Sequence, residues 1–287
     1  MGDKIKMRTL VTGGSGYLGS VLVTRLGERH DVTVLDLREP SNREVEWIKE
    51  DIRNNGRLEN IAEDFDSVIH LAAVVGDAAC NKDPNLAVET NYLATKALAK
   101  VCKKNGTQIL FASTCSVYGA TGLKYKENDD PQPFSLYGMT KLVAEKDILD
   151  AGGIVLRLAT LHGYSPRLRV DLVVNEFVRK AMAGRIVVYG GRQLRPFLHV
   201  SDAADAFVQA LGTASEVYNV ASENMSILEL AQMISDLIPC KLEVMEQIID
   251  KRSYVVDSTK ITERLSFEFK RGIKDSVEEL KSALSNR

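Results

Sequence analysis

Short apolar runs alternate with longer amphipathic stretches through the first half of the chain. The runs are rich in Val, Ile and Leu, which is typical of strands buried in a parallel sheet. They lie at 8–11, 32–35, 67–70 and 108–111. Apolar positions recur at helical spacing over 17–29 and 84–104, and the second stretch begins with an N-cap and a first-turn proline at Asp83-Pro84. The alternation predicts an α/β fold, a doubly wound parallel Rossmann sheet.

The pattern loosens after about residue 163. We expect a helix over 171–183, helices over 226–237 and 275–284, and short strands near 186–188 and 217–219. These elements predict a smaller mixed α/β C-terminal lobe over 164–287, next to a Rossmann domain over 1–163. The segment 196–212 has the pattern of a strand followed by a helix, and we expect it to return to the Rossmann domain.

Composition and charge exclude several classes of protein. The chain has 287 residues, of which 45% are hydrophobic and 26% charged, an ordinary globular balance. Its net charge of −2 gives no general attraction to nucleic acid or anionic lipid. No apolar run approaches the roughly 18 residues that span a bilayer, and the first, 7–11, leads into a glycine-rich turn instead of a cleavage site. The four cysteines form no CxxC pair. We therefore expect a reduced, cytoplasmic protein without a nucleic-acid or membrane partner.

A glycine-rich turn connects the first strand to the first helix. The sequence TGGSGYLG over 12–19 satisfies both GxxGxxG and GxGxxG. Glycine permits the tight turn and a close approach to a pyrophosphate, and the helix N-terminus offers N–H groups to that anion. Asp36 ends the second strand about 20 residues later, where a carboxylate binds ribose hydroxyls and repels a 2′-phosphate. The pattern predicts NAD rather than NADP as cofactor. The predicted contacts are Gly13, Gly16, Tyr17, Leu18, Gly19 and Asp36.

Two further segments carry candidate chemistry. Tyr137 and Lys141 lie one helical turn apart, on one face. A tyrosine has a pKa near 10, so its use as a base at neutral pH needs about 4 kcal/mol of phenolate stabilisation, which an adjacent Lys⁺ and the positive ring of NAD⁺ supply. A second YxxxK pair, Tyr92 and Lys96, lies in mid-helix, and we expect it to face neighbouring structure or solvent. The pair Tyr137 and Lys141 has a partner upstream, because Thr114 follows the strand expected over 108–111, where a hydroxyl can bind the substrate oxygen.

With these motifs in this order, the chain resembles the extended short-chain dehydrogenases that act on nucleotide sugars, an NAD-dependent epimerase/dehydratase family of the UDP-glucose 4-epimerase type. The resemblance covers nearly the whole chain. It implies that Thr114, Tyr137 and Lys141 are catalytic, with Tyr137 as the base and Lys141 also binding the ribose. Leu71, Ala72 and Ala73 follow the strand expected over 67–70, where small residues let a flat cofactor lie against the backbone. The resemblance adds Asp51, Ile52 and Asn91 as further cofactor contacts.

The resemblance also implies a substrate site for a nucleotide-diphosphate sugar. Arg195 matches the arginine that contacts the diphosphate, Arg252 a further nucleotide contact, and Asn175 lies in a segment leading into the site. Arginine suits this task because its planar fork binds phosphate oxygens bidentately. The expected substrate-binding residues are Thr114, Ser116, Asn175, Arg195 and Arg252. Ala159 departs from the family, where many members carry asparagine. No His, Cys, Asp and Glu set has ligand spacing, so we expect no metal.

The residues after Thr114 distinguish the reactions of this family. The resemblance implies that a 4,6-dehydratase carries an Asp-Glu pair there, whereas this chain has Cys115 and Ser116. A 3,5-epimerase-reductase carries a cysteine at the position of Ser116. C4 epimerisation and simple C4 oxidation remain, and segments 74–80 and 165–169 are also similar to nucleotide-heptose 4-dehydrogenases. We expect an NAD-dependent nucleotide-sugar 4-epimerase, with a UDP-hexose favoured. The alternative is a 4-dehydrogenase or another sugar-nucleotide-modifying enzyme of this family, and a 4,6-dehydratase is disfavoured.

An oligomer is also implied by the resemblance. The helices expected over 84–104 and 135–150 are similar to the pair that forms a four-helix interface between two subunits in this family. We therefore expect a homodimer.

Overall fold

A computed structural model describes residues 6–120, 122–247, 250 and 252–285. Its centre is a seven-stranded sheet in the order β11-β7-β5-β4-β1-β2-β3, and every pair of neighbours is parallel. The strands are β1 (Arg8–Thr12), β2 (Asp31–Asp36), β3 (Glu46–Lys49), β4 (Ser67–His70), β5 (Gln108–Thr114), β7 (Ile154–Leu158) and β11 (Val217–Val220). The chain direction across the sheet reverses between β1 and β4, the place where doubly wound sheets bind ligands. The expected fold class is confirmed.

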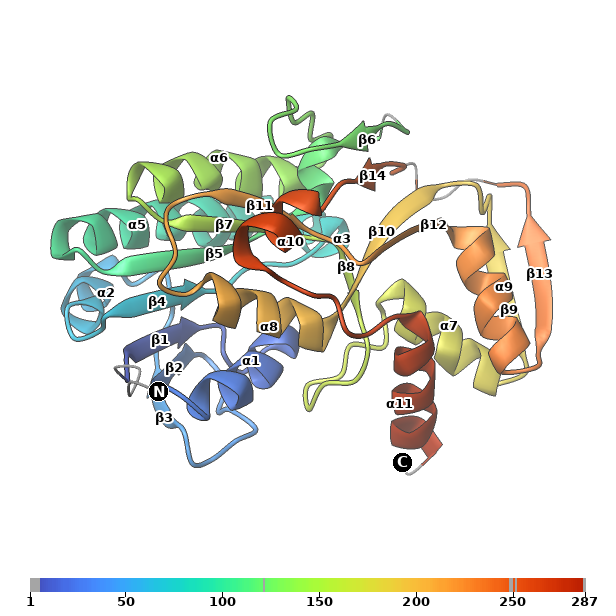
Figure 1. Cartoon of the computed structure of the whole chain (residues 1–287), viewed down its shortest axis with the longest axis horizontal. Coiled ribbons are helices and arrows are strands. Elements are labelled where there is room, and N and C mark those ends of the chain that lie inside the picture. The colour runs from blue at the N-terminus through green and yellow to red at the C-terminus, as the bar shows by residue number, and fades with distance from the viewer. Residues whose placement is uncertain (1–5, 121, 248–249, 251, 286–287) are drawn as a thin grey trace.

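Helices cover both faces of this sheet (Figure 1). On one face lie α2 (Asn55–Ala62), α5 (Ala94–Asn105) and α6 (Leu136–Asp150), and on the other α1 (Tyr17–Gly27) and α8 (Val200–Ala210). Successive strand residues point to opposite faces, so Phe111 packs in the first layer and Leu110 in the second. Both side chains are fully buried. The continuous apolar runs of the sequence reflect this double burial.

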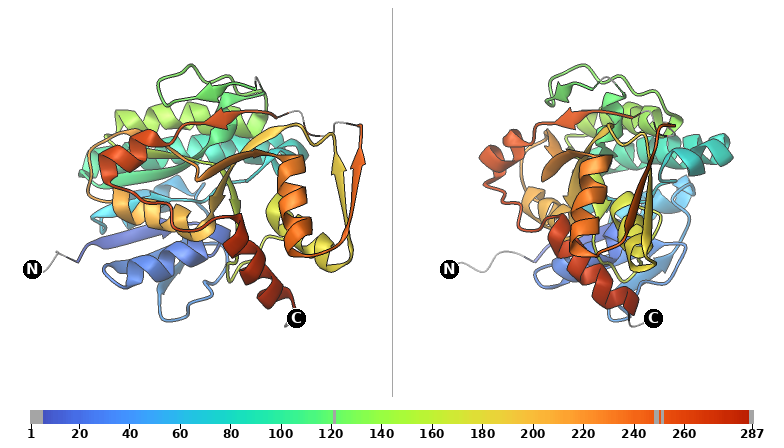
Figure 2. Two further views of the ribbon diagram at one scale, coloured as in Figure 1. Left: turned by 45° about the vertical axis from the view of Figure 1, so that its right-hand side comes forward. Right: turned by 90° about the vertical axis from the view of Figure 1, so that its right-hand side faces the viewer.

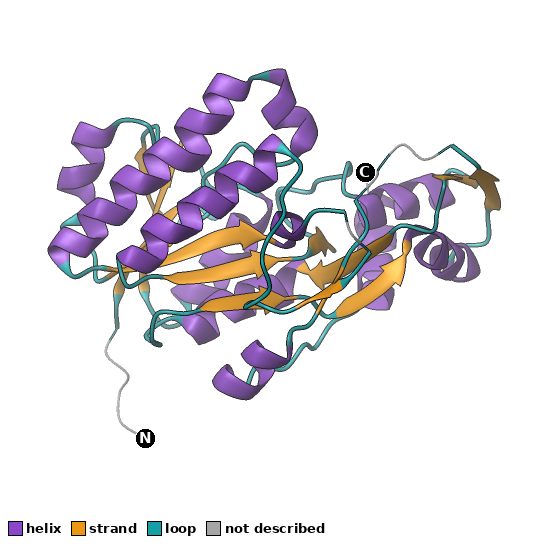
Figure 3. Cartoon of the chain, turned by 90° about the horizontal axis from the view of Figure 1, so that it is seen from above, coloured by secondary structure: helices purple, strands orange, loops and turns teal. Residues whose placement is uncertain are grey.

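The smaller lobe lies beyond the ends toward which the strand arrows point, and Figures 2 and 3 show it as a separate group of elements. It has its own apolar core, which includes Val178, Ile234 and Leu280. One sheet has the order β12-β10-β8 and another pairs β9 with β13. The elements are β8 (Thr160–His162), α7 (Val173–Met182), β9 (Arg185–Tyr189), β10 (Leu194–His199), β12 (Glu223–Ser226), α9 (Ile227–Leu237), β13 (Lys241–Met245) and α11 (Ile273–Ser285).

Two strands join other sheets than the sequence pattern indicated. The strand of segment 196–212, β10, pairs with β8 and β12 instead of entering the seven-stranded sheet, although the helix of that segment, α8, does pack against α1. The strand expected near 217–219 in the smaller lobe is β11, which extends the main sheet beside β7. Apolar periodicity reports that a strand is buried, but it carries no information on its partner. Both expectations for these strands were therefore wrong.

The long helix expected over 84–104 is interrupted by a π-helical turn. Its parts are α4 (Pro84–Val88), the turn η1 (Glu89–Leu93) and α5, and α3 (Asp77–Lys82) precedes them. The wide turn places the side chain of Asn91 against the loop after β4, where it bonds both backbone groups of Val74. Such turns occur mostly at functional sites. The other elements are the short helix η2 (Cys115–Tyr118), β6 (Lys124–Tyr125), which pairs with β14 (Val255–Val256), and α10 (Thr259–Leu265).

A buried ion pair connects α6 to the sheet. The guanidinium of Arg157 on β7 donates to both carboxylate oxygens of Glu145 on α6, at 2.7 to 3.2 Å. Ser113 on β5 also donates to Glu145, and Arg157 donates to the Tyr118 hydroxyl at 2.8 Å. Both charged side chains are at most 6% exposed. The position of α6 therefore depends on a desolvated pair whose remaining polar atoms are bonded.

Substituting Glu145→Gln tests this connection. The variant leaves the Arg157 charge buried without its counter-ion, so we expect the free energy of unfolding to fall by about 3–5 kcal/mol. Urea unfolding measures it. Glu63→Gln removes the partner of Lys104 in an exposed pair, and we expect no loss. An equal, small loss in both variants would contradict a dominant role for the buried pair.

Candidate active site

A cleft of about 1470 Å³ opens at the carboxyl ends of the parallel strands, between the main sheet and the smaller lobe. Residues from both parts of the chain line it. Of the site residues predicted from the sequence, all except Asn91 and Asn175 are among the lining residues. The structure thus brings together side chains from the glycine-rich turn, the loop after β5, the start of α6 and the end of the chain.

The glycine-rich turn has no space for side chains at two positions. Gly13 has a φ of +73°, and a Cβ atom there would lie 2.6 Å from the backbone nitrogen of Ala72. A Cβ on Gly19 would lie 2.4 Å from the carbonyl oxygen of Gly13. The N-cap of α1 is Gly16, which offers no side chain to the first turn. The N–H groups of that turn face the cleft region without a capping side chain, as a pyrophosphate site requires.

Carboxylates mark the adenosine end of the cleft. Asp36 accepts hydrogen bonds from the backbone N–H groups of Ser15 and Arg38, both at 3.0 Å, so it is fixed next to the glycine-rich turn. Asp51 is held by Arg53, and these hydrogen bonds lower the pKa of Asp51. Ile52, which follows Asp51, is buried in the core cluster that includes Leu35 of β2. This part of the cleft fits the ribose and base of a dinucleotide.

Asn91 supports the floor of the cleft from behind. Its side chain accepts from the N–H of Val74 at 2.7 Å and donates to the Val74 carbonyl at 2.9 Å. The preceding residues Leu71, Ala72 and Ala73 line the cleft, whereas Asn91 itself is fully buried. Its amide therefore fixes the loop on which a cofactor lies, rather than reaching the cleft.

The three residues proposed for catalysis meet at one place. Lys141 is buried, with its Nζ 4.4 Å from the ring centre of Phe111, and burial lowers its pKa from 10.5 to about 7. Burial also raises the pKa of Tyr137, as does the Cys80 thiol, while a hydrogen bond with Thr114 acts in the opposite direction. Thr114 and Tyr137 thus lie close together in the cleft, one turn of α6 from the ammonium. Ser135 caps that helix by accepting from the N–H of Gly138 at 3.2 Å.

The second YxxxK pair lies elsewhere. Lys96 is exposed and donates to the hydroxyl of Tyr92 at 3.4 Å, on α5 and η1. Neither residue lines the cleft. This pair thus faces neighbouring structure and solvent, whereas Tyr137 and Lys141 both line the cleft.

Two arginines face each other at the far end of the cleft, where a diphosphate is expected. Arg195 is 4% exposed and lies 2.6 Å from the carboxylate of Asp250. Arg252 donates to the same carboxylate at 2.7 Å and 3.0 Å. Ser116 and Tyr254 share a hydrogen bond of 3.3 Å beside them. The described structure therefore contains an acidic group between the two cations that were assigned to a substrate anion.

Asn175 does not reach the cleft. It is fully buried, accepts from the N–H of Gly163 at 3.1 Å and donates to the carbonyl of Arg169 at 2.8 Å. It also donates to the hydroxyl of Tyr17, which in turn donates to the Gly163 carbonyl. Its contacts join α7 to the segment after β8, so the side chain shapes one wall of the site without lining it.

Sequence reasoning missed several lining residues. They are Asp77, Arg169, Gln193, Asp250 and Tyr254. Arg169 and Asp77 lie in the segments 165–169 and 74–80 that show a family resemblance, and Asp250 lies two positions before Arg252. No periodicity or motif indicates that Asp250 and Arg195 meet, because 55 positions separate them in the chain. An acidic residue followed by two basic ones at 250–252 is the local signal for the missed carboxylate.

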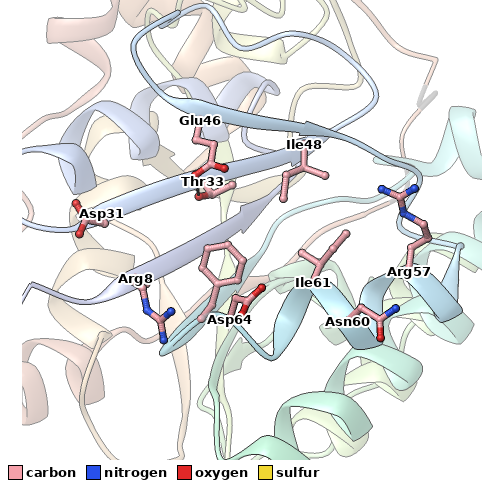
Figure 4. Close-up of a pocket in the computed structure, with 10 residues that line it drawn as sticks. Arg8, Asp31, Thr33, Glu46, Ile48, Arg57, Asn60, Ile61 and Asp64 are labelled. Atoms are coloured by element: carbon pink, nitrogen blue, oxygen red, sulfur yellow. Dashed lines mark hydrogen bonds between the residues drawn. The ribbon is translucent and has the colours of Figure 1, made fainter.

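A second hollow of about 680 Å³ lies at the opposite end of the strands (Figure 4). Side chains from the starts of β1, β2 and β3 face those of α2 across it. Its polar groups are paired locally, since Thr33 donates to Glu46 at 3.1 Å and Arg57 lies 3.1 Å from Glu50. Among the described residues, no group of three or more His, Cys, Asp and Glu could hold a metal ion, and no helix is long and apolar enough to cross a membrane.

Residues 9–221 match the model of the NAD dependent epimerase/dehydratase family. The chain belongs to this family. NAD is accordingly its cofactor, in agreement with the glycine-rich turn and Asp36. The family resemblance inferred from the motifs is confirmed.

Relatives differ in the reaction that their names state. A UDP-N-acetyl-alpha-D-glucosaminuronate decarboxylase of Bacillus cytotoxicus is 28% identical, with 96% of this chain and 98% of that protein covered. Among solved structures, MoeE5 in complex with UDP-glucuronic acid and NAD has a TM-score of 0.87 at 28% identity, covering 98% and 100% of the two chains. A UDP-glucose 4-epimerase of Thermotoga maritima with UDP-glucose also has a TM-score of 0.87, at 26% identity, covering 97% and 100%.

Burial of the Lys141 ammonium is expected to lower the free energy of unfolding. In the folded protein the pKa of Lys141 is about 7, below its ordinary 10.5, so the unfolded chain binds more protons between these pH values. Stability then rises as pH increases from 7 toward 10, and the cost is fully present below pH 7. We expect Lys141→Met to raise the free energy of unfolding at pH 7 by on the order of 3 kcal/mol and to remove this pH dependence. Urea unfolding without added cofactor, at pH 7 and pH 9.5, measures both.

Lys96→Met serves as the control, because it removes the lysine of the exposed YxxxK pair. It should leave both the stability and its pH dependence unchanged. A Lys141→Met protein that is less stable than the parent at pH 7 would contradict the expected cost.

Proposed function

We propose that this protein is an NAD-dependent 4-epimerase of a neutral nucleotide-diphosphate hexose, with a UDP-hexose as the favoured substrate. The observation that carries the proposal is the meeting of Thr114, Tyr137 and Lys141 in the cofactor cleft with no carboxylic acid following Thr114. Cys115 is fully buried and its Sγ bonds the carbonyl of Arg157 at 3.0 Å. It is therefore directed into the core and offers no acid or base for dehydration.

The chain's own groups suit removal of a proton from the C4 hydroxyl. NAD, held by the glycine-rich turn and Asp36, supplies a hydride acceptor when bound. Thr114 holds the hydroxyl that Tyr137 deprotonates, since the two side chains lie close together and both line the cleft. Lys141 places a positive charge beside the developing phenolate, in a dry environment where that charge acts strongly. For the inverted alcohol to form, the hydride would have to return from the reduced cofactor to the other face of C4 once the 4-keto sugar has turned over, while the same phenol returns the proton to O4.

The other end of the cleft suits a diphosphate. Arg195 and Arg252 converge on the carboxylate of Asp250, which demonstrates that both guanidinium groups can reach a single anion. We propose that phosphate oxygens take this place when substrate binds, since arginine forks bind carboxylate and phosphate with the same geometry. The distance between this end and Tyr137 is then filled by the sugar.

A second candidate follows from the names of the relatives. Oxidation at C4 of a hexuronate gives a β-keto acid, which loses CO₂ without a dedicated base. The same triad therefore supports epimerisation of a neutral hexose or decarboxylation of a uronate, and the group at C6 decides between them. The decarboxylases among the relatives favour a uronate. The carboxylate of Asp77, which lines the cleft with Tyr137, favours a neutral sugar because it repels a second carboxylate.

Proton NMR of the sugar distinguishes the two reactions. We expect NAD-loaded protein to convert UDP-galactose and UDP-glucose, supplied separately, to one common mixture without net NADH in the absorbance spectrum. UDP-glucuronate should remain unchanged and release no CO₂. Formation of a pentose with CO₂ would replace the epimerase by the decarboxylase, and accumulation of NADH would favour a 4-dehydrogenase.

Tyr137→Phe tests the proposed base in the same assay. The variant lacks the phenolic oxygen but keeps the ring, so we expect turnover to fall by at least about 10²-fold while NAD remains bound. Tyr92→Phe, which alters the exposed YxxxK pair, should retain full activity. Wild-type turnover in Tyr137→Phe would exclude this residue as the base.

We further propose a homodimer formed by the helices around η1 and α6. Four large apolar side chains are exposed on this surface, Val88, Leu93, Met139 and Val143. The helices α4, η1 and α6 that carry them pack against one another, so these side chains belong to one face. Light scattering at micromolar concentration should give twice the mass of 31.7 kDa. Leu93→Asp with Val143→Asp should give the monomer mass, and a monomeric parent protein would contradict the proposal.

A further inference from the structure

A carboxylate that no motif explains faces the cleft beside the proposed base. Asp77 is the first residue of α3 and lines the cleft. Its Oδ1 is buried and has no hydrogen-bond partner, and its Oδ2 lies 3.5 Å from Nη1 of Arg252. A buried carboxylate oxygen without a donor costs free energy, so such an oxygen in a substrate cleft indicates that a ligand supplies the donor.

The loop that carries Asp77 is fixed from several sides. Gly76 precedes it with a φ of +91°, and the N–H of Cys80 donates to the Gly76 carbonyl at 3.1 Å. The Cys80 Sγ bonds the carbonyl of Val74 at 3.3 Å, and Asn91 holds both polar backbone groups of Val74. These contacts leave the Asp77 side chain attached to a rigid support, so its carboxylate keeps its position in the cleft.

Asp77 lies at the start of α3, which packs against the helix α6 that carries Tyr137, and both side chains line the cleft. After burial and the Cys80 thiol, the carboxylate of Asp77 also contributes to the raised pKa of Tyr137. Its other charged neighbour is Arg252, at the diphosphate end. Asp77 therefore lies between the proposed base for the C4 hydroxyl and the diphosphate end, along the stretch of the cleft that the sugar would fill.

We propose that Asp77 selects the sugar: its free oxygen accepts a hydrogen bond from a sugar hydroxyl near C4, and its charge excludes a hexuronate. This inference rests on the proposed function, because it assumes that a nucleotide sugar is bound with C4 at Tyr137. A carboxylate accepts hydrogen bonds from a hydroxyl but can only repel a second ionised carboxylate.

The cations near this position already have partners. Arg169, which lines the cleft and acts electrostatically on Tyr137, donates to Asp171 at 3.0 Å through Nε. Arg252 is paired with Asp250 as well as with Asp77. A uronate entering beside Asp77 would therefore need to break an existing ion pair to find a counter-charge. A neutral hexose has no such requirement.

The test compares two ligands that differ only at the sugar. Isothermal titration measures Kd for UDP-galactose and UDP-glucuronate on the NAD-loaded parent protein, Asp77→Asn, Asp77→Glu and Glu59→Gln. Glu59 is an exposed carboxylate on α2, so its substitution changes the net charge equally without touching the cleft. UDP alone reports any effect on the diphosphate end through Arg252.

In the parent protein we expect UDP-galactose to bind more tightly than UDP-glucuronate. Asp77→Asn should weaken UDP-galactose by about tenfold or more, the loss of one hydrogen bond to a charged acceptor, and should tighten UDP-glucuronate severalfold. Asp77→Glu retains the charge and should still reject UDP-glucuronate. Glu59→Gln should behave as the parent protein does. A ratio of the two Kd values that is the same in Asp77→Asn and in the parent would overturn the inference.

The epimerase assignment and the role of Asp77 can fail independently, and the experiments distinguish the two cases. If the parent protein does not interconvert UDP-galactose and UDP-glucose in the NMR assay, the epimerase assignment fails, while a shifted Kd ratio in Asp77→Asn still supports the selection. If the parent protein epimerises and the ratio does not change, the epimerase assignment stands and Asp77 has no part in choosing the sugar.

Discussion

The Arg157–Glu145 ion pair is the contact on which the geometry of the cleft depends. Glu145 lies one turn of α6 beyond Lys141, and its carboxylate is bonded by β7 through Arg157 and by β5 through Ser113. The helix that carries Tyr137 is thus fixed to β7 and to β5, the strand that ends at Thr114. Apolar packing alone would tolerate small shifts of a helix on a sheet, whereas a desolvated, multiply bonded ion pair has essentially one favourable geometry. The close approach of Thr114 and Tyr137 follows from this constraint.

The chemistry of the cleft opposes the stability of the fold. Burial lowers the pKa of Lys141 to about 7 and raises that of Tyr137, so the site holds both groups in environments that disfavour their charged forms. An ammonium and a phenolate compensate each other only when both are charged, which a proton-transfer step achieves. His70 beneath them is bonded to Thr12 and Thr95, and burial followed by the Lys141 charge lowers its pKa to about 3. A neutral imidazole therefore separates the buried lysine from the core without adding a competing positive charge.

The sequence predicted the sheet and the cofactor because these depend on local pattern, and all the residues proposed for the cofactor half of the site except Asn91 line one cleft. Val68 and Ile69 lie in an apolar run, Gly13 and Gly19 fill a spacing that sterics demand, and Tyr137 and Lys141 are one turn apart on a helix. The partners of β10 and β11 could not be predicted, since burial is the same in any sheet. Asn91 and Asn175 are predicted to contact ligands, yet the side-chain amide of each is hydrogen-bonded to backbone groups that shape the walls of the cleft. Asp250 and Arg195 meet across 55 positions, and only folding brings such charges together.

The carboxylate of Asp250 between Arg195 and Arg252 gives the cleft an internal counter-ion. An anion that enters there exchanges with a resident charge and not merely with water, so the local net charge changes little on binding. Affinity at such a site varies less with ionic strength than it does where bare cations attract a ligand through solvent. The exchange also favours dianions, because a singly charged anion gains nothing over the carboxylate it displaces. The protein can in this way keep Arg195 and Arg252 in position without binding small inorganic anions.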